Sequence, residues 1–191
     1  MPSINLKNRE ITVKIVYYGP GRSGKTTNLK YIHEKYRSRI GSEITTIKTH
    51  GDRTLFFDFL PFDIGKVNGY DLRVQLYTVP GQVQYNTTRK LVLKDVDGIV
   101  FVADSIKVRK EKNIHSLKNL QRNLAEIFKN NGRSIFNTPL VFQYNKRDLE
   151  GTGIPLSPVD ALNKLLNSKL RAPYFEASAL TGENVVKTMK E

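Results

Sequence analysis

A glycine-rich loop near the start of this sequence carries a pattern that binds phosphate groups. Residues 19–26 read Gly-Pro-Gly-Arg-Ser-Gly-Lys-Thr and match the phosphate-binding pattern G-x-x-x-x-G-K-[ST]. The backbone N–H groups of such a loop curl around a β-phosphate, and the N-terminus of the following helix adds partial positive charge. We expect the Lys25 ammonium to bridge the β- and γ-phosphates and the Thr26 hydroxyl to bind Mg²⁺. The phosphate-binding residues predicted in this loop are Gly19, Gly21, Arg22, Ser23, Gly24, Lys25, Thr26 and Thr27.

That loop predicts a nucleoside triphosphate without naming its base, and a second polar segment indicates guanine. The tetrapeptide at 145–148 reads Asn-Lys-Arg-Asp and directly follows an apolar run. Its carboxylate can accept hydrogen bonds from the guanine N1–H and exocyclic amine, a donor pair that adenine lacks. Further along, a backbone N–H at 178–180, that of Ala179, would bind the guanine O6. The predicted guanine-binding residues are Asn145, Lys146, Asp148, Ser178, Ala179 and Leu180.

The segments around these polar residues alternate between strand-like and helix-like patterns. A β-branched run at 11–18 precedes the glycine loop, and a helical pattern follows it from Thr26 to Tyr36. Continuous apolar runs at 98–104 and 140–144 are typical of strands covered on both faces, with an amphipathic helix between them at 114–128. A helix at 158–167, a strand at 174–177 and a helix at 183–190 complete the pattern. The alternation predicts an α/β fold with a mostly parallel sheet of six or seven strands, helices on both faces and a ligand at the carboxyl ends of the strands.

One edge of the sheet is expected to be antiparallel. Strand-like runs at 55–60 and 71–77 are joined through Asn68-Gly69, a dipeptide suited to the positive φ angles of a tight hairpin. The first run carries large apolar side chains at both parities: Leu55, Phe56, Phe57, Phe59, Leu60 and Phe62. Either both faces of this strand are covered, or the strand is weakly committed to one register and slides between nucleotide states.

Length and composition bound the remaining possibilities. The 191 residues suit a single domain spanning 1–191, and the sequence has no internal repeat or linker. Without cysteine the chain can form no disulfide, thiolate zinc site or S-linked lipid, and Pro2 after Met1 is incompatible with N-myristoylation. We find no secretory signal and no apolar run of about 18 residues, so we expect a cytoplasmic protein without a lipid anchor. His33, His50 and His115 show no metal-ligand spacing.

The chain is strongly basic, with a net charge of +13 from 31 Lys+Arg against 18 Asp+Glu. This charge would suit nucleic acid, peripheral contact with an anionic membrane, or an acidic partner protein. The basic residues are spread out and not interleaved with aromatic residues, which favours an ordinary solvated surface and no specific nucleic-acid ligand. The densest cluster, Lys107, Arg109, Lys110 and Lys112, falls at an expected loop-to-helix junction.

Taken in order, the glycine loop, the N-K-R-D segment and the S-A-L segment resemble those of small Ras-like GTPases. The sequence is most similar to the bacterial gliding-motility (MglA-type) family, through GPGxxGKTTN, DRTLFFDFLP and TVPGQ, and the resemblance covers nearly the whole chain. It implies a Ras-like P-loop NTPase (G) domain acting as a molecular switch, which binds GTP or GDP with Mg²⁺ and hydrolyses GTP slowly unless stimulated. It also implies a role in cell polarity and gliding or surface motility, with concentration at a cell pole. The implied partners are a roadblock-fold homodimeric activator of the MglB type, motility effectors and an exchange factor.

The resemblance also assigns roles to residues around the γ-phosphate. Thr54 would join Thr26 on Mg²⁺ in the GTP state, and Gly81 would offer its backbone N–H to the γ-phosphate. Gln82 would orient the attacking water, and Arg53 would act as an arginine finger in cis. Ordinary Ras-like proteins have D-x-x-G where this chain has Thr78-Val-Pro-Gly, a departure that predicts weaker Mg²⁺ binding.

Three rival functions remain at this point. The chain could be a P-loop ATPase or kinase, although N-K-x-D argues against adenine. It could be an interaction module that holds nucleotide without hydrolysing it, which Thr78 makes conceivable. It could also be a nucleic-acid binder that exploits the +13 charge.

Overall fold

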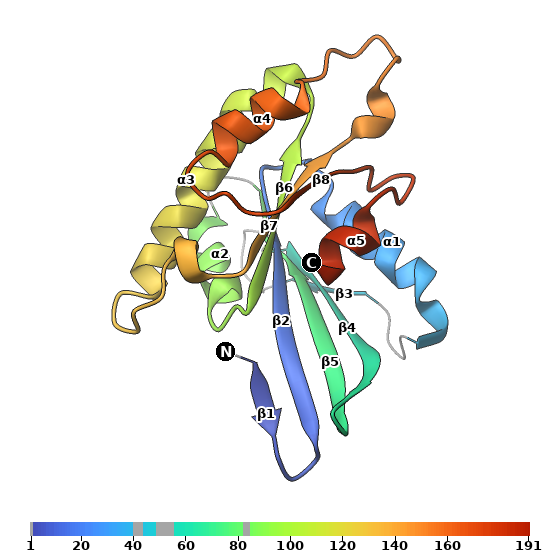
Figure 1. The fold of residues 1–191 in the computed structure, drawn as a ribbon, viewed down its shortest axis with the longest axis vertical. Coiled ribbons are helices and arrows are strands. Elements are labelled where there is room, and N and C mark those ends of the chain that lie inside the picture. The colour runs from blue at the N-terminus through green and yellow to red at the C-terminus, as the bar shows by residue number, and fades with distance from the viewer. Residues whose placement is uncertain (1, 40–43, 49–55, 82–84) are drawn as a thin grey trace.

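The computed structural model describes residues 2–39, 44–48, 56–81 and 85–191, and these residues build one mixed sheet covered by helices (Figure 1). The strands are β1 (Ser3–Asn5), β2 (Glu10–Tyr18), β3 (Thr45–Lys48), β4 (Phe56–Val67), β5 (Tyr70–Thr78), β6 (Gly98–Asp104), β7 (Leu140–Asn145) and β8 (Tyr174–Glu176). Their order in the sheet is β3-β4-β5-β2-β6-β7-β8, and β1 pairs with β2. The strands from β5 to β8 in this order run parallel, as the alternation of strands and helices predicts.

The sheet has eight strands where the sequence predicts six or seven. The additional strands are β1 and β3, which both pair antiparallel with their neighbours. They span three and four residues, reading Ser-Ile-Asn and Thr-Thr-Ile-Lys, and one isoleucine in each makes neither an apolar run nor an alternating pattern. Strand β1 is exposed along its whole length and extends the sheet beside the amino-terminal half of β2.

The predicted hairpin between β4 and β5 is confirmed. Val67 pairs with Tyr70, which leaves Asn68 and Gly69 as a two-residue turn with φ angles of 50° and 81°. Positive φ at both turn residues matches the right-handed twist of paired strands.

Strand β4 has neighbours on both of its faces. The Phe59 ring lies 4.8 Å from the ring of its partner Tyr77, which packs on one core, while Leu60 is buried in the other. This arrangement favours coverage on both faces as the reason for the mixed apolar pattern. Leu55 lies outside the described residues, and sliding of the strand stays a prediction.

Helices cover both faces of the sheet, as predicted. The α-helices are α1 (Lys25–Lys35), α2 (Asn86–Leu93), α3 (Lys110–Ile127), α4 (Val159–Leu166) and α5 (Val185–Lys190), and the 3₁₀ helices are η1 (Arg37–Arg39), η3 (Lys107–Arg109), η4 (Ile135–Asn137) and η5 (Arg147–Leu149). Helices α1 and α5 lie on one side of the sheet, and α2, α3 and α4 lie on the other (Figure 1). In the part of the chain that the structure describes, no helix is long and apolar enough to cross a bilayer.

Two apolar cores fix these layers, because successive side chains of a strand point to opposite faces. On β6, Val100 and Val102 join the core under α1 and α5, whereas Ile99 and Phe101 join the core under α2, α3 and α4. With both faces buried, the register of each parallel strand is strongly specified. The loops after β2, β5, β6, β7 and β8 are therefore held at one edge of the sheet.

Candidate functional site

A cleft of about 1440 Å³ lies among these loops. Its walls include predicted phosphate-binding residues, the 145–148 loop and the segment at 179–180. Among the described lining residues, the cationic side chains are Arg22, Lys25, Arg89, Arg109, Lys112, Lys118 and Lys146, and the acidic ones are Glu111 and Asp148. Seven cations against two carboxylates give a net +5, which attracts an anionic ligand and raises its local concentration.

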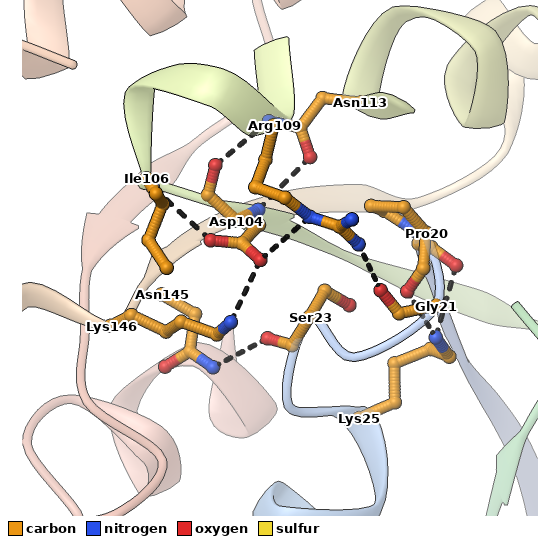
Figure 2. A network of polar contacts seen from close by, with 11 residues as sticks. Pro20, Gly21, Ser23, Lys25, Asp104, Ile106, Arg109, Asn113, Asn145 and Lys146 are labelled. Carbon is orange, nitrogen blue, oxygen red and sulfur yellow. Dashed lines mark hydrogen bonds and ion pairs between the residues drawn. The ribbon is translucent and has the colours of Figure 1, made fainter. Parts of the chain in front are cut away.

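The glycine loop turns sharply between β2 and α1, which begins at Lys25. Arg22 (φ 64°) and Gly24 (φ 101°) both adopt left-handed conformations, and turns of this kind create concave nests of backbone N–H groups that bind anions. The Lys25 ammonium is buried and crosses the loop, donating to the carbonyl oxygens of Gly19 at 3.0 Å and Pro20 at 2.7 Å (Figure 2). The loop is thus closed by its own lysine in a shape suited to phosphate.

Most of the residues predicted for this loop line the cleft, and two do not. Gly21, Arg22, Gly24, Lys25, Thr26 and Thr27 are lining residues. Gly19 and Ser23 are absent from the lining, and the Ser23 side chain is fully buried. Ser23 instead contributes its carbonyl oxygen, which accepts a hydrogen bond from Asn145 Nδ2 at 2.7 Å.

Asn145, at the end of β7, joins three segments that are far apart in the sequence. Its Nδ2 donates to Ser23 in the glycine loop, and its Oδ1 accepts from the Ala179 N–H at 2.8 Å. Gly24 makes this possible by close approach, because a Cβ at that position would overlap the Asn145 amide. Asn145 is itself buried, so this one side chain fixes the phosphate loop, the 145–148 loop and the 178–180 segment relative to one another.

The predicted guanine-binding residues come from the 145–148 loop and the 178–180 segment, and all of them except Ser178 line the cleft. Lys146, Asp148 and Leu180 line it, with Asp148 in η5 and the Leu180 side chain 75% exposed. Ser178 is buried and does not line the cleft. The Ala179 N–H already donates to Asn145, so a hydrogen bond to a guanine O6 would have to be shared between two acceptors.

The segment after β5 borders the cleft from the opposite side. Thr78 is buried and, like Gly81, is a lining residue. The preceding carbonyl of Pro80 accepts a hydrogen bond at 3.1 Å from Arg89 of α2, whose pKa is lowered by burial. Arg53, Thr54 and Gln82 lie outside the described residues.

The described residues of the cleft could bind a divalent cation only together with a phosphate-bearing ligand that supplies further oxygen atoms. In the described ranges, no group of three His, Asp or Glu side chains could hold a metal ion. The exposed Thr26 lies in the first turn of α1 and lines the cleft, and its hydroxyl is the kind of hard oxygen donor that suits Mg²⁺. The remaining oxygens would have to come from phosphate groups and water.

Asp104 and Arg109 connect the two halves of the cleft, and neither was predicted as a site residue from the sequence (Figure 2). Asp104 ends β6, and its Oδ2 accepts from Lys146 Nζ at 2.8 Å and from Arg109 Nε at 3.3 Å. The terminal nitrogen of Arg109 donates to the Gly21 carbonyl oxygen. The sequence signal that could have indicated Asp104 is its position at the carboxyl end of the apolar run GIVFVAD, where side chains of a parallel sheet reach the ligand.

A buried pair of amide side chains, also not predicted from the sequence, holds α1 against β7 beneath the cleft. Asn28 of α1 and Gln143 of β7 are both fully buried and exchange amide hydrogen bonds of 2.8 Å and 3.0 Å. Asn28 also donates to the Gly24 carbonyl oxygen at 2.9 Å. The pair fixes the first turns of α1 against β7, so the phosphate loop and the 145–148 loop start from a rigid base.

Comparison with known proteins bears on both the fold and the site. The model of the Ras family matches residues 14–191 of this chain. The Mutual gliding-motility protein MglA of Myxococcus xanthus (strain DK1622) is 49% identical to it over 190 residues. That alignment covers 100% of this chain and 93% of the relative.

Proposed function

This chain belongs to the Ras family and, within it, to the MglA-type Ras-like GTPases, and from that premise we propose that it is a molecular switch whose output is binding. As a GTPase of this family it binds GTP and GDP. We propose that it hydrolyses GTP slowly unless an activator is present, and that it changes partner when the γ-phosphate is lost. The observation that carries the proposal is the Asn145 side chain, which holds the phosphate loop and the base-side segments around one cationic cleft.

The two sides of the cleft have complementary tasks in this proposal. The glycine loop, with its buried Lys25, receives the β- and γ-phosphates, and Asp148 accepts the hydrogen bonds of guanine. Gly81 borders the phosphate end, where its backbone N–H would sense the γ-phosphate. Loss of that phosphate would then release the segment after β5. This segment includes Pro80, whose carbonyl oxygen accepts a hydrogen bond from Arg89.

Mg²⁺ is the cofactor that we propose for this cleft. When bound, it neutralises charge on the phosphate oxygens during transfer. Thr26 would hold it together with Thr54, one of the residues outside the described ranges. Because Thr78 carries no charge where Ras-like proteins ordinarily have Asp, we expect weaker Mg²⁺ affinity.

Hydrolysis is assigned to residues that the structure does not describe. We propose that Gln82 orients the attacking water and that Arg53 spreads the transition-state charge from within the same chain. An arginine in cis that is ordered by a partner would explain slow intrinsic turnover and stimulation without a donated arginine. The partner we propose is a roadblock-fold homodimer of the MglB type.

The cellular role is proposed from the relative, whose name refers to gliding motility. We propose that this chain regulates cell polarity and surface motility from the cytoplasm, concentrated at a pole, through effectors and an exchange factor. Residues 1–191 would form one G domain. The basic surface would suit peripheral contact with an anionic membrane.

Single-turnover GTP hydrolysis tests the proposal. The parent, Arg53→Ala and Gln82→Leu are preloaded with GTP and Mg²⁺, and phosphate release is followed with and without a roadblock-fold dimer. We expect stimulated turnover in the parent and a loss of about 10³-fold in both variants, the scale on which arginine fingers act. Gln121→Leu, on α3 away from the cleft lining, is the matched control and should behave like the parent.

One rival retains a specific observation in its favour. Thr78 at the edge of the cleft is compatible with a module that holds nucleotide without hydrolysing it. If GTP turnover in the parent equals that of Gln82→Leu under both conditions, the nucleotide-holding module is the better account. ATP that displaces bound GDP at similar concentrations would instead favour an ATPase.

A further inference from the structure

Arg109 differs from the basic residues around it. Lys107, Lys110 and Lys112 are exposed, in keeping with the solvated cluster expected from the sequence. The Arg109 side chain is only 18% exposed and is engaged at both ends of its guanidinium group. Nε contacts Asp104 at 3.3 Å, and a terminal nitrogen donates to the Gly21 carbonyl oxygen (Figure 2).

Asp104 is a rigid anchor for this arginine. Its carboxylate is fully buried, and Oδ1 accepts from the Ile106 N–H at 3.1 Å. Its backbone N–H and carbonyl oxygen both bond to the buried Asn113 amide of α3, at 3.0 Å and 2.9 Å. The carboxylate therefore cannot rotate away without breaking several bonds in a region of low dielectric.

The same Asp104 oxygen holds cations from both halves of the cleft. Lys146 belongs to the 145–148 loop and lies 2.8 Å from Oδ2, while Arg109 reaches the glycine loop. One buried carboxylate thus connects the base side to the phosphate side. If Arg109 is removed, Lys146 and the Ile106 N–H still pair with this carboxylate, so only the connection to the glycine loop is lost.

Gly21, at the far end of this connection, meets the segment after β5. A Cβ placed on Gly81 would overlap the backbone of Gly21, so the two glycines are in close backbone contact. Arg109 donates a hydrogen bond to the Gly21 carbonyl oxygen. It therefore fixes the residue of the glycine loop that contacts Gly81, whose N–H is proposed to sense the γ-phosphate. Arg109 has no need to touch the nucleotide to do this.

We propose that Arg109 is a positioning residue which, anchored on Asp104, holds the glycine loop closed and so sets the rate at which the nucleotide is released. This inference rests on the proposed function, because it presumes a nucleotide in the cleft. Without the guanidinium group, the Gly21 carbonyl loses a charge-assisted hydrogen bond, and the loop opens more often. Loss of one such bond corresponds to a release rate about tenfold higher.

The test is the dissociation rate of fluorescent mant-GDP, chased with excess GDP in Mg²⁺, for the parent, Arg109→Ala and Arg109→Lys. We expect release to be about tenfold faster from Arg109→Ala. Lysine can satisfy Asp104 or Gly21 but not both, so Arg109→Lys should be intermediate. Arg133→Ala is the matched control, because Arg133 is also partly buried and donates from a guanidinium nitrogen to a backbone carbonyl, that of Val96, at 2.9 Å. It should release nucleotide like the parent.

A second readout separates positioning from a general loss of structure. Inosine diphosphate lacks the exocyclic amine of guanine, so the ratio of IDP to GDP release rates reports on the base side alone. Arg109→Ala should leave this ratio unchanged while both rates rise. A changed ratio, or an equal acceleration in Arg133→Ala, would overturn the positioning role.

Failure of the inference is distinguishable from failure of the proposed function. If the parent does not bind mant-GDP, the proposed function fails and the inference fails with it. If the parent binds and Arg109→Ala releases GDP within twofold of the parent rate, only the inference is wrong. Should Arg109→Ala not fold, a parent-like rate in Arg109→Lys would likewise overturn it.

Discussion

Selection of the base depends, at the scale of single residues, on Asp148 in η5 at the rim of the cleft. Replacement of Asp148 by Asn turns one of its two acceptors into a donor. Guanine then loses a bond to its exocyclic amine, whereas xanthine, with a carbonyl at that position, gains one. We expect Asp148→Asn to weaken GDP binding about hundredfold and to favour xanthosine diphosphate, as measured by competition against a fluorescent nucleotide.

The control for this prediction lies two residues away. Glu150 is also a carboxylate, 74% exposed, and pairs with Arg147 at 3.2 Å. Glu150→Gln should keep the parent preference for guanine. If Asp148→Asn also keeps it, Asp148 does not read the base.

Single residues were predictable from the sequence where a motif fixes their spacing. The glycine loop and N-K-R-D were found because their residues are consecutive, and most of them line one cleft. Asp104 and Arg109 belong to no such motif, and their joint contact with Lys146 arises only when β6 lies beside β7. The hydrogen bond from the Ala179 N–H to Asn145 Oδ1 likewise depends on the fold.

The hairpin between β4 and β5 offers a test at the scale of an element. Gly69 has a φ of 81°, and a Cβ there would meet nothing within 4 Å. Gly69→Ala should therefore lower the free energy of unfolding by about 1 kcal/mol through backbone conformation alone. Urea unfolding monitored by circular dichroism measures the change.

Gly98, at the start of β6, is the matched control. Its φ is not in the left-handed range, and an added Cβ would make an ordinary contact of 3.9 Å with Ile15. Gly98→Ala should leave stability unchanged or raise it slightly. Equal destabilisation by the two substitutions would mean that the turn conformation is not what Gly69 supplies.

At the scale of elements, the long and buried strands and helices were the most clearly marked in the sequence. The parallel strands β6 and β7 are continuous apolar runs buried on both faces, and α3 shows a long apolar stripe. Helix α2 was missed because it has no start signal such as the Pro158 that precedes the equally short α4, and its Leu91 is 68% exposed. Strands β1 and β3 were missed because each contains a single apolar residue.

For the molecule as a whole, buried tyrosines predict instability in alkali. Burial raises the pKa of Tyr17 and of Tyr144, and it raises the pKa of Tyr18 to about 12. A tyrosine titrates near pH 10 in the unfolded chain, so between pH 10 and 12 the folded state binds more protons and stability falls as pH rises. For Tyr18 alone the loss is about 1.4 kcal/mol per pH unit.

Urea unfolding at pH 8 and pH 11 checks this expectation. Tyr18→Phe should lose less stability between these pH values than the parent, by about 1 kcal/mol. Ile99→Val, which changes the same core without removing an ionisable group, should lose as much stability as the parent between the two pH values. Identical pH dependence in all three proteins would show that ionisation of Tyr18 is not coupled to unfolding.

Equilibrium competition between guanine and adenine nucleotides tests whether the cleft selects guanine. Purified protein is loaded with mant-GDP in Mg²⁺ and titrated with unlabelled GDP or ADP. We expect displacement by GDP at near-stoichiometric concentration, and by ADP only at concentrations about 10⁴-fold higher, because adenine leaves Asp148 unpaired. Displacement by ADP at the same concentration as GDP would show that the cleft does not select guanine.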